Sequence, residues 1–115
     1  MHIIYYQDED GKCVVKEWIV KLEPKVQAKI YRDIDLLERF GLALGEPYIK
    51  KLTKDGIWEL RTKLGSDIYR VLFGIEGDMI ILHGFQKKTQ KTPTREIQTA
   101  LKRLKKFSKG GEVYE

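Results

Sequence analysis

Two arginines lie inside segments whose residues alternate as in β-strands. Arg61 belongs to IWELRTK at residues 57–63, and Arg70 belongs to IYRVLFGI at residues 68–75. Because the pleat of a strand fixes the direction of each side chain, strands that carry cations can hold a polyanion in a defined place. A guanidinium group stays charged at any relevant pH and grips phosphate oxygens through two hydrogen bonds. The pattern predicts that both arginines bind phosphate; the alternative is that they are solvated strand residues paired with acidic neighbours.

Candidates for proton transfer lie near these arginines. Glu59 alternates onto the same predicted face as Arg61 and could act as a base. His83 is a second candidate, since the unperturbed pKa of histidine near ~6.5 suits acid–base work; the alternative is a hydrogen-bonded core histidine, because its segment is the most apolar one. Alternation groups this histidine with Met79, Ile81 and Phe85. Lys87 and Lys88 follow directly and are expected to act through their charge.

Length and composition bound the class of protein. The chain has 115 residues, of which 42% are hydrophobic, enough for one globular domain with a modest core. No run of about 18 apolar residues occurs, so we expect no membrane span, and the acidic start does not resemble a signal peptide. Cys13 is the only cysteine, which excludes an internal disulfide and favours a reducing cytoplasm. The histidines and the cysteine lack the spacing of a metal site, so we expect no metal and no other cofactor.

Charge is unevenly distributed along the chain. Residues 1–47 hold 7 lysines and arginines against 9 acidic residues, which gives −2, whereas residues 48–106 hold 14 against 6, which gives +8. The basic part is the part that contains the predicted strands with arginines. Such an asymmetry is typical of a surface that binds nucleic acid, and equally of a surface that binds an acidic partner.

The first half of the chain predicts a strand and two helices. HIIYY at residues 2–6 is a β-branched and aromatic run typical of a strand. Apolar residues at helical spacing predict a short helix over residues 15–22. Pro24 suits the first position of a second helix, and Gly41 suits its end. Residues 41–47, with two glycines and a proline, are expected to form a loop.

The second half predicts an antiparallel meander of residues 57–63, 68–75 and 79–86, joined by short turns that contain glycine. A last helix is expected to use Thr92 as its cap and Pro93 as its first residue. The fold class is therefore α+β, in the order βααβββα, with the two N-terminal helices on one face of a small antiparallel sheet and a C-terminal helix.

Strand alternation predicts which side chains form the core. The face beneath the two N-terminal helices should carry Trp58, Leu60, Val71 and Phe73. Arg61 and Arg70 should then share the opposite, open face. Residues 1–107 are expected to form a single domain and residues 108–115 a flexible C-terminal tail.

Several segments carry a resemblance to a known family. They are YIKKL at residues 48–52, IWELR at 57–61, YRVLF at 69–73, and LHGFQKKTQKTP at 82–93, which precedes a helix with Glu96 and Ala100. In this order and spacing, across residues 2–107, the chain resembles the RelE/ParE superfamily of bacterial type II toxin–antitoxin toxins. The likeness is closest to the HigB-type branch, the phage-derived host-killing toxin group.

The resemblance implies a metal-independent endoribonuclease that inhibits translation by cleaving mRNA on the ribosome. It also implies a cognate helix-turn-helix antitoxin, similar to HigA, that neutralises the toxin and carries the complex to operator DNA. Two other readings stay open. One is a ParE-like DNA gyrase poison without nuclease activity, and the other is a non-toxic module that binds RNA or a partner.

Some site residues follow from the resemblance. Arg70 matches the strand arginine that binds the scissile phosphate in RelE-like enzymes, and Arg61 falls where these have a sheet lysine. Lys87 or Lys88 falls near their later catalytic arginine. Glu59 stands where another basic residue is expected, and residues 91–95 contain no counterpart of their C-terminal tyrosine, so the general acid and base stay open.

Further lysines are expected to bind the RNA backbone, because phosphate contacts need only positive charge. The alternative for each is an ordinary solvated position. These candidates are Lys50, Lys51, Lys54, Lys63 and Lys91.

Overall fold

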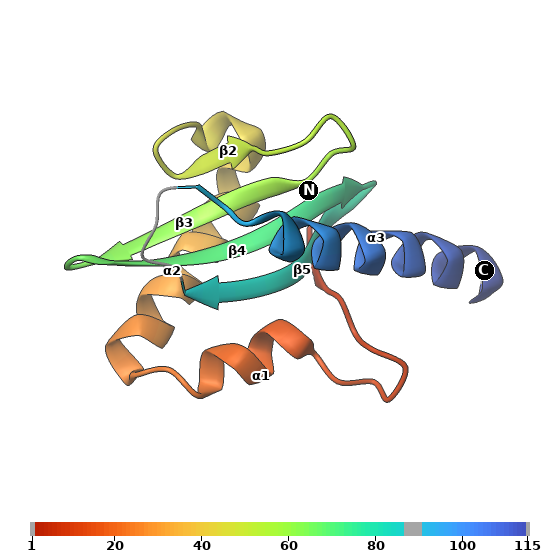
Figure 1. The fold of residues 1–115 in the computed structure, drawn as a ribbon, viewed down its shortest axis with the longest axis horizontal. Coiled ribbons are helices and arrows are strands. Elements are labelled where there is room, and N and C mark those ends of the chain that lie inside the picture. Colours follow the sequence, from red (N-terminus) through yellow and green to blue (C-terminus); the bar gives the residue numbers. More distant parts are fainter. Residues whose placement is uncertain (1, 87–90, 115) are drawn as a thin grey trace.

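The computed structural model describes residues 2–86 and 91–114, with side chains up to residue 109. The described residues form three α-helices and a short 3-10 helix, which are α1 (Val14–Val20), α2 (Pro24–Phe40), η1 (Gly41–Leu44) and α3 (Thr94–Tyr114) (Figure 1). They also form five strands, which are β1 (Ile3–Tyr5), β2 (Ile49–Lys51), β3 (Trp58–Leu64), β4 (Asp67–Glu76) and β5 (Asp78–Gln86). None of the helices in these ranges has the length and apolar character that a membrane span requires.

The strands form one sheet in the order β1-β5-β4-β3-β2. The β3, β4 and β5 strands make the predicted antiparallel meander, and β1 pairs with β5 in parallel. The predicted α+β class is confirmed. The sheet is mixed, because the N-terminal strand β1 lies parallel to β5 whereas the other strand pairs are antiparallel.

The α2 helix begins and ends where the sequence predicts. Its first residue is Pro24, whose missing N–H would have no helical partner at that position. It ends at Phe40, and Gly41 follows with φ +57°, a left-handed conformation that glycine adopts without steric cost. Its apolar stripe, Val26, Ile30, Ile34 and Leu37, is buried.

The sheet has an apolar core on each of its two faces. On one face, α1 and α2 cover Leu60, Val71 and Phe73, with Trp58 packed beside them, as predicted. On the other face, α3 covers a second cluster that includes Leu72, Ile80 and Leu82. Figure 1 shows α3 crossing this face, with α2 behind the sheet. The prediction that Arg61 and Arg70 share an open face is therefore wrong, because α3 and the segment before it cover that face.

Two glycines in the sheet let the helices come close. A Cβ at Gly74 in β4 would lie 2.9 Å from Leu104 Cδ2 of α3. On the opposite face, a Cβ at Gly84 in β5 would lie 2.3 Å from the ring of Trp18 in α1. The clash at Gly84 is with a rigid ring, so α1 can pack here only against glycine, whereas a Cβ at Gly74 would require the end of the Leu104 side chain to shift.

The β2 strand was not predicted. It has three residues, pairs antiparallel with β3 and sets Lys50 directly opposite Glu59. The strand is short and two of its three residues are lysines, so it shows no apolar alternation. Charged residues are common in edge strands such as this one. Before it, Gly41–Leu44 form η1 within the segment that was predicted as a loop.

A bulge in β5 changes the alternation of its side chains. Leu72 pairs with His83 while Phe73 pairs with Ile81, so Leu82 is an extra residue. His83 therefore lies on the α3 side of the sheet with Phe85, whereas Met79 and Ile81 lie in the core beneath α1 and α2. The predicted grouping with Met79 and Ile81 is wrong because simple alternation does not survive a bulge.

The last helix differs from expectation at both ends. It begins at Thr94 rather than Pro93, and the Pro93 carbonyl accepts the first helical hydrogen bonds, from Glu96 and Ile97. It extends to Tyr114, beyond the predicted end of the domain at residue 107. On its inner side Ala100 is buried, with Leu101 and Leu104 packed beside it.

Candidate active site

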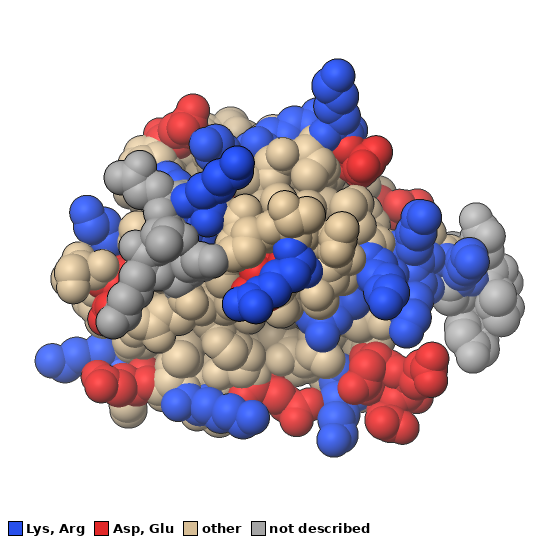
Figure 2. Space-filling view, in the orientation of Figure 1, with Lys and Arg blue, Asp and Glu red and all other residues tan. Residues whose placement is uncertain are grey.

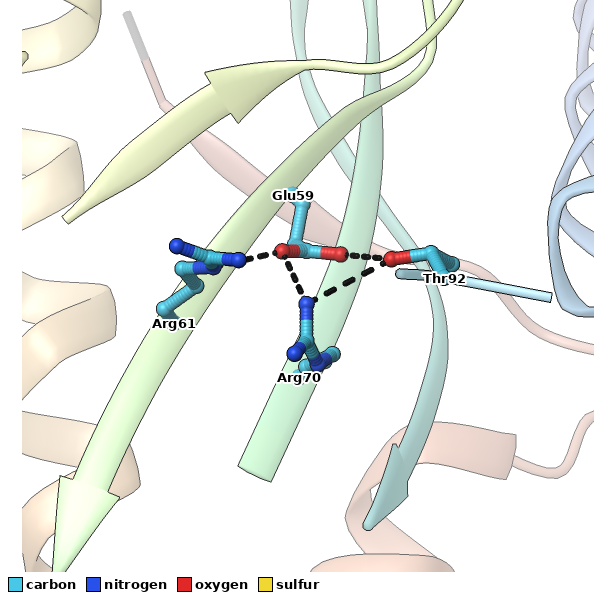
Figure 3. A network of polar contacts seen from close by, with 4 residues as sticks. All are labelled: Glu59, Arg61, Arg70 and Thr92. Atoms are coloured by element: carbon cyan, nitrogen blue, oxygen red, sulfur yellow. Dashed lines mark hydrogen bonds and ion pairs between the residues drawn. The ribbon is translucent and has the colours of Figure 1, made fainter. Parts of the chain in front are cut away.

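A carboxylate on β3 organises the polar contacts on the α3 side of the sheet. Glu59 is fully buried, and its Oε1 accepts hydrogen bonds from Arg61 Nε at 2.9 Å and from Arg70 Nη1 at 2.7 Å. Its Oε2 accepts a hydrogen bond from the Thr92 hydroxyl, and Arg70 Nη1 lies 3.5 Å from that same hydroxyl oxygen (Figure 3). A carboxylate can accept from several donors at once, so Glu59 fixes the direction of two guanidinium groups.

Strand pairing brings these side chains together. Glu59 and Arg61 are two residues apart on β3 and therefore point to the same face. Arg70 on β4 lies directly opposite Arg61. Two like charges at opposed positions repel each other, and the Glu59 carboxylate offsets this repulsion. The predicted sharing of one face by these three residues is confirmed.

The two arginines differ in access to solvent. The side chain of Arg70 is 1% exposed, whereas that of Arg61 is 31% exposed. Arg70 therefore contributes its charge from beneath the surface, where little water screens it. Arg61 can contact a bound molecule directly while its Nε stays fixed by Glu59.

A pocket of about 200 Å³ opens over this network. Five cations and one carboxylate line it, together with Thr92, Leu52 and Ile97; the charged residues are Lys50, Lys51, Glu59, Arg61, Arg70 and Lys91. Figure 2 shows lysine and arginine side chains over β2 and β3 in this part of the surface, and a second group over α3. Such an excess of positive charge in a partly enclosed hollow favours an anion.

The structure thus gathers six of the predicted site residues in one pocket, and it places others elsewhere. Lys54 is exposed in the turn after β2, and Lys63 is exposed near the end of β3 and lines a different hollow. Lys87 and Lys88 lie outside the described residues. Their predicted roles stay predictions.

His83 belongs to a second polar cluster, between β5 and α3. Its Nε2 lies 2.9 Å from Glu96 Oε1, and its Nδ1 lies 3.2 Å from Arg103 Nη1. Arg103 can only donate, so Nδ1 must accept and the proton is assigned to Nε2, which donates to Glu96. This histidine is neutral, partly buried and does not line the pocket. Its role as a proton carrier stays a prediction.

Burial lowers the pKa of His83 below its ordinary value. The hydrogen bond and the charge of Glu96 oppose this shift, and the charge of Arg103 adds to it. The net direction favours the neutral ring, in agreement with the hydrogen bonds. Arg103 also donates to the Leu82 carbonyl at 2.9 Å, beside the bulge.

Sequence reasoning missed three residues of these clusters, Thr92, Glu96 and Arg103. Thr92 was predicted as a helix cap, but its hydroxyl binds Glu59 instead. The spacing of Glu96 and Arg103, seven residues apart on one helix, places them on a common face. That signal was present, but the sequence did not indicate that His83 faces them.

The described residues contain no group of three or more histidine, cysteine, aspartate or glutamate side chains that could hold a metal ion. The polar groups of the pocket are mainly cationic, and cations suit an anionic ligand rather than a metal. The arrangement can therefore bind a phosphate group and stabilise additional negative charge on it.

Known proteins resemble this chain over the part that contains the pocket. Residues 17–105 match the family described as phage derived protein Gp49-like (DUF891). The proteins named "Probable endoribonuclease HigB1" in two Mycobacterium tuberculosis strains are 38% identical over 100 residues, which are 84% of this chain and 75% of each relative. All residues that line the pocket fall within residues 17–105. The chain therefore belongs to the phage-derived, Gp49-like family of HigB-type toxins, within the RelE/ParE superfamily.

Proposed function

We propose that this chain is the toxin of a type II toxin–antitoxin module and acts as an endoribonuclease that cleaves mRNA on the ribosome. The observation that carries the proposal is the pocket in which Glu59 orients Arg61 and Arg70 beneath three lysines. Relatives that are 38% identical carry the name "Probable endoribonuclease HigB1", which supports the same class of reaction here.

The reaction would be an in-line attack within the RNA chain. The 2′-oxygen of a ribose forms a bond to the adjacent phosphorus as the bond from phosphorus to the 5′-oxygen breaks. The 2′-hydroxyl loses its proton and the leaving 5′-oxygen gains one, which gives a cyclic 2′,3′-phosphate and a free 5′-hydroxyl. Negative charge accumulates on the phosphoryl oxygens in the transition state, so preorganised cations accelerate the step.

The pocket residues divide this work according to their exposure. Arg61 contacts the phosphoryl oxygens, since its side chain is partly exposed and its Nε is fixed. Arg70 adds positive charge from beneath and, with Thr92, holds Glu59 in place. In this proposal Glu59 is a positioning residue, because its oxygens are engaged by Arg61, Arg70 and Thr92.

The surrounding lysines hold the RNA backbone on either side. Lys50 and Lys51 on β2 and Lys91 before α3 are exposed at the rim of the pocket. Because phosphate contacts depend on charge, RNA binding should weaken steeply with salt.

Five cations around the pocket supply the charge stabilisation that the step requires, so we propose that the reaction is independent of metal. Cleavage of RNA by the purified chain, with ribosomes present, should proceed at the same rate after dialysis against EDTA. A loss of activity that Mg²⁺ restores to the chain, with ribosome integrity controlled separately, would contradict this part of the proposal.

The proposed partners follow from family membership. They are mRNA, the ribosome, and a helix-turn-helix antitoxin similar to HigA that neutralises the toxin and binds operator DNA. An open reading frame for a small helix-turn-helix protein beside the gene would support the proposal of an antitoxin partner.

Mapping of mRNA 5′ ends after induction tests the function. New 5′-hydroxyl ends inside coding regions should appear with the wild-type chain and with Arg39→Ala, an exposed change on α2 that lies away from the pocket. They should be absent with Arg61→Ala. Growth arrest with intact mRNA and altered DNA supercoiling would instead assign the chain to the gyrase poisons.

A further inference from the structure

A second hollow, of about 390 Å³, lies on the other side of Arg61. It runs between α2 and the end of β3, and Arg61 lines both it and the 200 Å³ pocket. The hollow, which we call the edge groove, is lined by Lys29, Arg32, Asp33, Leu36, Pro47, Tyr48, Arg61, Lys63 and Ile68.

The edge groove exists because β2 is short. Its pairing with β3 covers only Trp58 to Leu60, and the last backbone contact is the hydrogen bond from Arg61 N to the Tyr48 carbonyl at 2.8 Å. Beyond this point, Lys29 of α2 donates to the Lys63 carbonyl on the edge of β3. The helix therefore closes one wall of the groove and the strand edge forms the other.

The lining of the edge groove is strongly basic. Four cations face one carboxylate, and that carboxylate is directed inward, since Asp33 is 5% exposed and accepts a hydrogen bond from the Thr62 hydroxyl at 2.8 Å. Arg32 and Lys63 are exposed. An approaching ligand would therefore meet mainly positive charge.

An aromatic ring lies among these cations. Tyr48 is 42% exposed, so part of its ring is accessible from the groove. Its backbone is fixed at both ends, because its N–H donates to the Gly45 carbonyl at 3.1 Å and its carbonyl accepts from Arg61. A ring presented from a fixed backbone, next to cations, is the combination that binds single-stranded nucleic acid by stacking and charge.

We propose that the edge groove binds the RNA strand that flanks the cleavage site. Arg32 and Lys63 hold its phosphates, and Tyr48 stacks on one of its bases. This inference rests on the proposed function, since Arg61 connects the groove to the pocket that would hold the scissile phosphate. An acidic protein segment would use the cations, but the Arg61 side chain shared with the pocket and the exposed ring of Tyr48 favour a nucleic-acid strand.

Binding of RNA that cannot be cleaved tests the inference. Two single-stranded oligonucleotides with 2′-O-methyl groups, a tetranucleotide and a dodecanucleotide, are titrated against the full chain at several salt concentrations. The wild-type chain should bind the longer one more tightly, because only that one reaches both the pocket and the edge groove.

Variants then locate the additional affinity. Arg32→Ala with Lys63→Ala should remove most of it and lower the slope of log affinity against log salt by about 1.4, since each phosphate contact to a single strand contributes about 0.7. Tyr48→Leu should weaken binding of the dodecanucleotide about tenfold, while Tyr48→Phe, which keeps the ring, should retain it. Arg39→Ala, which removes one positive charge from α2 outside the groove lining, is the control for a general loss of charge.

The outcomes separate this inference from the proposed function. No gain in affinity with length, or equal losses with Arg39→Ala and the double variant, would overturn the inference even if mRNA cleavage is found. Normal RNA binding by the variants with impaired binding of the antitoxin would assign the groove to a protein partner, which also overturns it. Length-dependent binding that the groove variants lose, in a chain that cleaves no mRNA, would uphold the groove and overturn only the nuclease. All variants are at exposed positions, and a thermal melt confirms that each is folded.

Discussion

Two polar clusters lie on the face of the sheet that α3 covers, and they are built from similar residues. One joins Glu59 to Arg61, Arg70 and Thr92, and the other joins His83 to Glu96 and Arg103. Their charge differs. The Glu59 cluster has two guanidinium groups for one carboxylate and opens into a pocket with three lysines, whereas the His83 cluster has one of each charge and a neutral ring.

The difference in charge favours the Glu59 cluster over the His83 cluster as a site for an anion. In the His83 cluster the charges balance and the groups attach α3 to β5, beside the bulge at Leu82. In the Glu59 cluster one positive charge is left in excess, and the partly exposed Arg61 presents it to the pocket. A histidine is the usual first candidate for acid–base chemistry, yet here the pocket is organised by a buried glutamate.

Removal of Arg70 should produce the largest effect on stability. Arg70→Met leaves the buried Glu59 carboxylate without its 2.7 Å partner, and breaking a buried ion pair costs about 3–5 kcal/mol. Arg103→Met should cost about 1–3 kcal/mol, since it removes hydrogen bonds from partly buried groups. Urea unfolding of the two variants and the wild-type chain measures both values.

A double variant shows whether that cost arises from the unpaired charge. Glu59→Gln with Arg70→Met removes both charges, so much of the lost stability should return. Equal costs for Arg70→Met and Arg103→Met would show that the two clusters contribute alike. Because Arg70 is buried, loss of activity in Arg70→Ala would report on the fold as well as on the chemistry.

Removal of Arg61 should produce the largest effect on cleavage with little effect on folding. Arg61→Ala deletes the cation that we propose contacts the phosphate, and loss of one preorganised donor lowers a rate by about 10²–10³. The side chain is 31% exposed, so we expect a stability change well below that of Arg70→Met. Single-turnover cleavage of ribosome-bound mRNA measures the rate, and Arg39→Ala serves as the exposed control. A rate within about threefold of the wild type would contradict the assignment of Arg61.

Much of the fold follows from local signals in the sequence. Pro24 and Gly41 define α2, and alternation along β3 and β4 predicts both the core face and the shared face of Arg61 and Arg70. These features depend on residues that are near each other in the chain or in facing strands.

What the sequence did not predict depends on long-range packing. The amphipathic pattern of α3 shows that it buries one side, but not against which face of the sheet, so the burial of Arg70 was not foreseen. The bulge at Leu82 is a relation between two strands, and β5 is apolar on both faces, so its residue pattern gives no sign of the shift. Thr92 is a good capping residue by its local sequence. Its contact with Glu59 joins residues 33 positions apart, so it depends on the tertiary fold.

The smallest of these effects concerns His83 and pH. Burial lowers the pKa of His83 in the folded chain, whereas the unfolded chain keeps the ordinary value near 6.5. Between these two values the unfolded chain binds a proton that the folded chain does not, so the free energy of unfolding should fall as pH decreases through this window and stay level above it. His83→Gln can donate to Glu96 and accept from Arg103 without titrating, and it should remove this part of the pH dependence. Unfolding of both chains at about pH 8 and about pH 5 measures the difference; parallel losses would show that His83 does not titrate as proposed.

The same variant completes the comparison, because normal mRNA cleavage by folded His83→Gln would assign the histidine to the attachment of α3 and leave the chemistry to the Glu59 cluster.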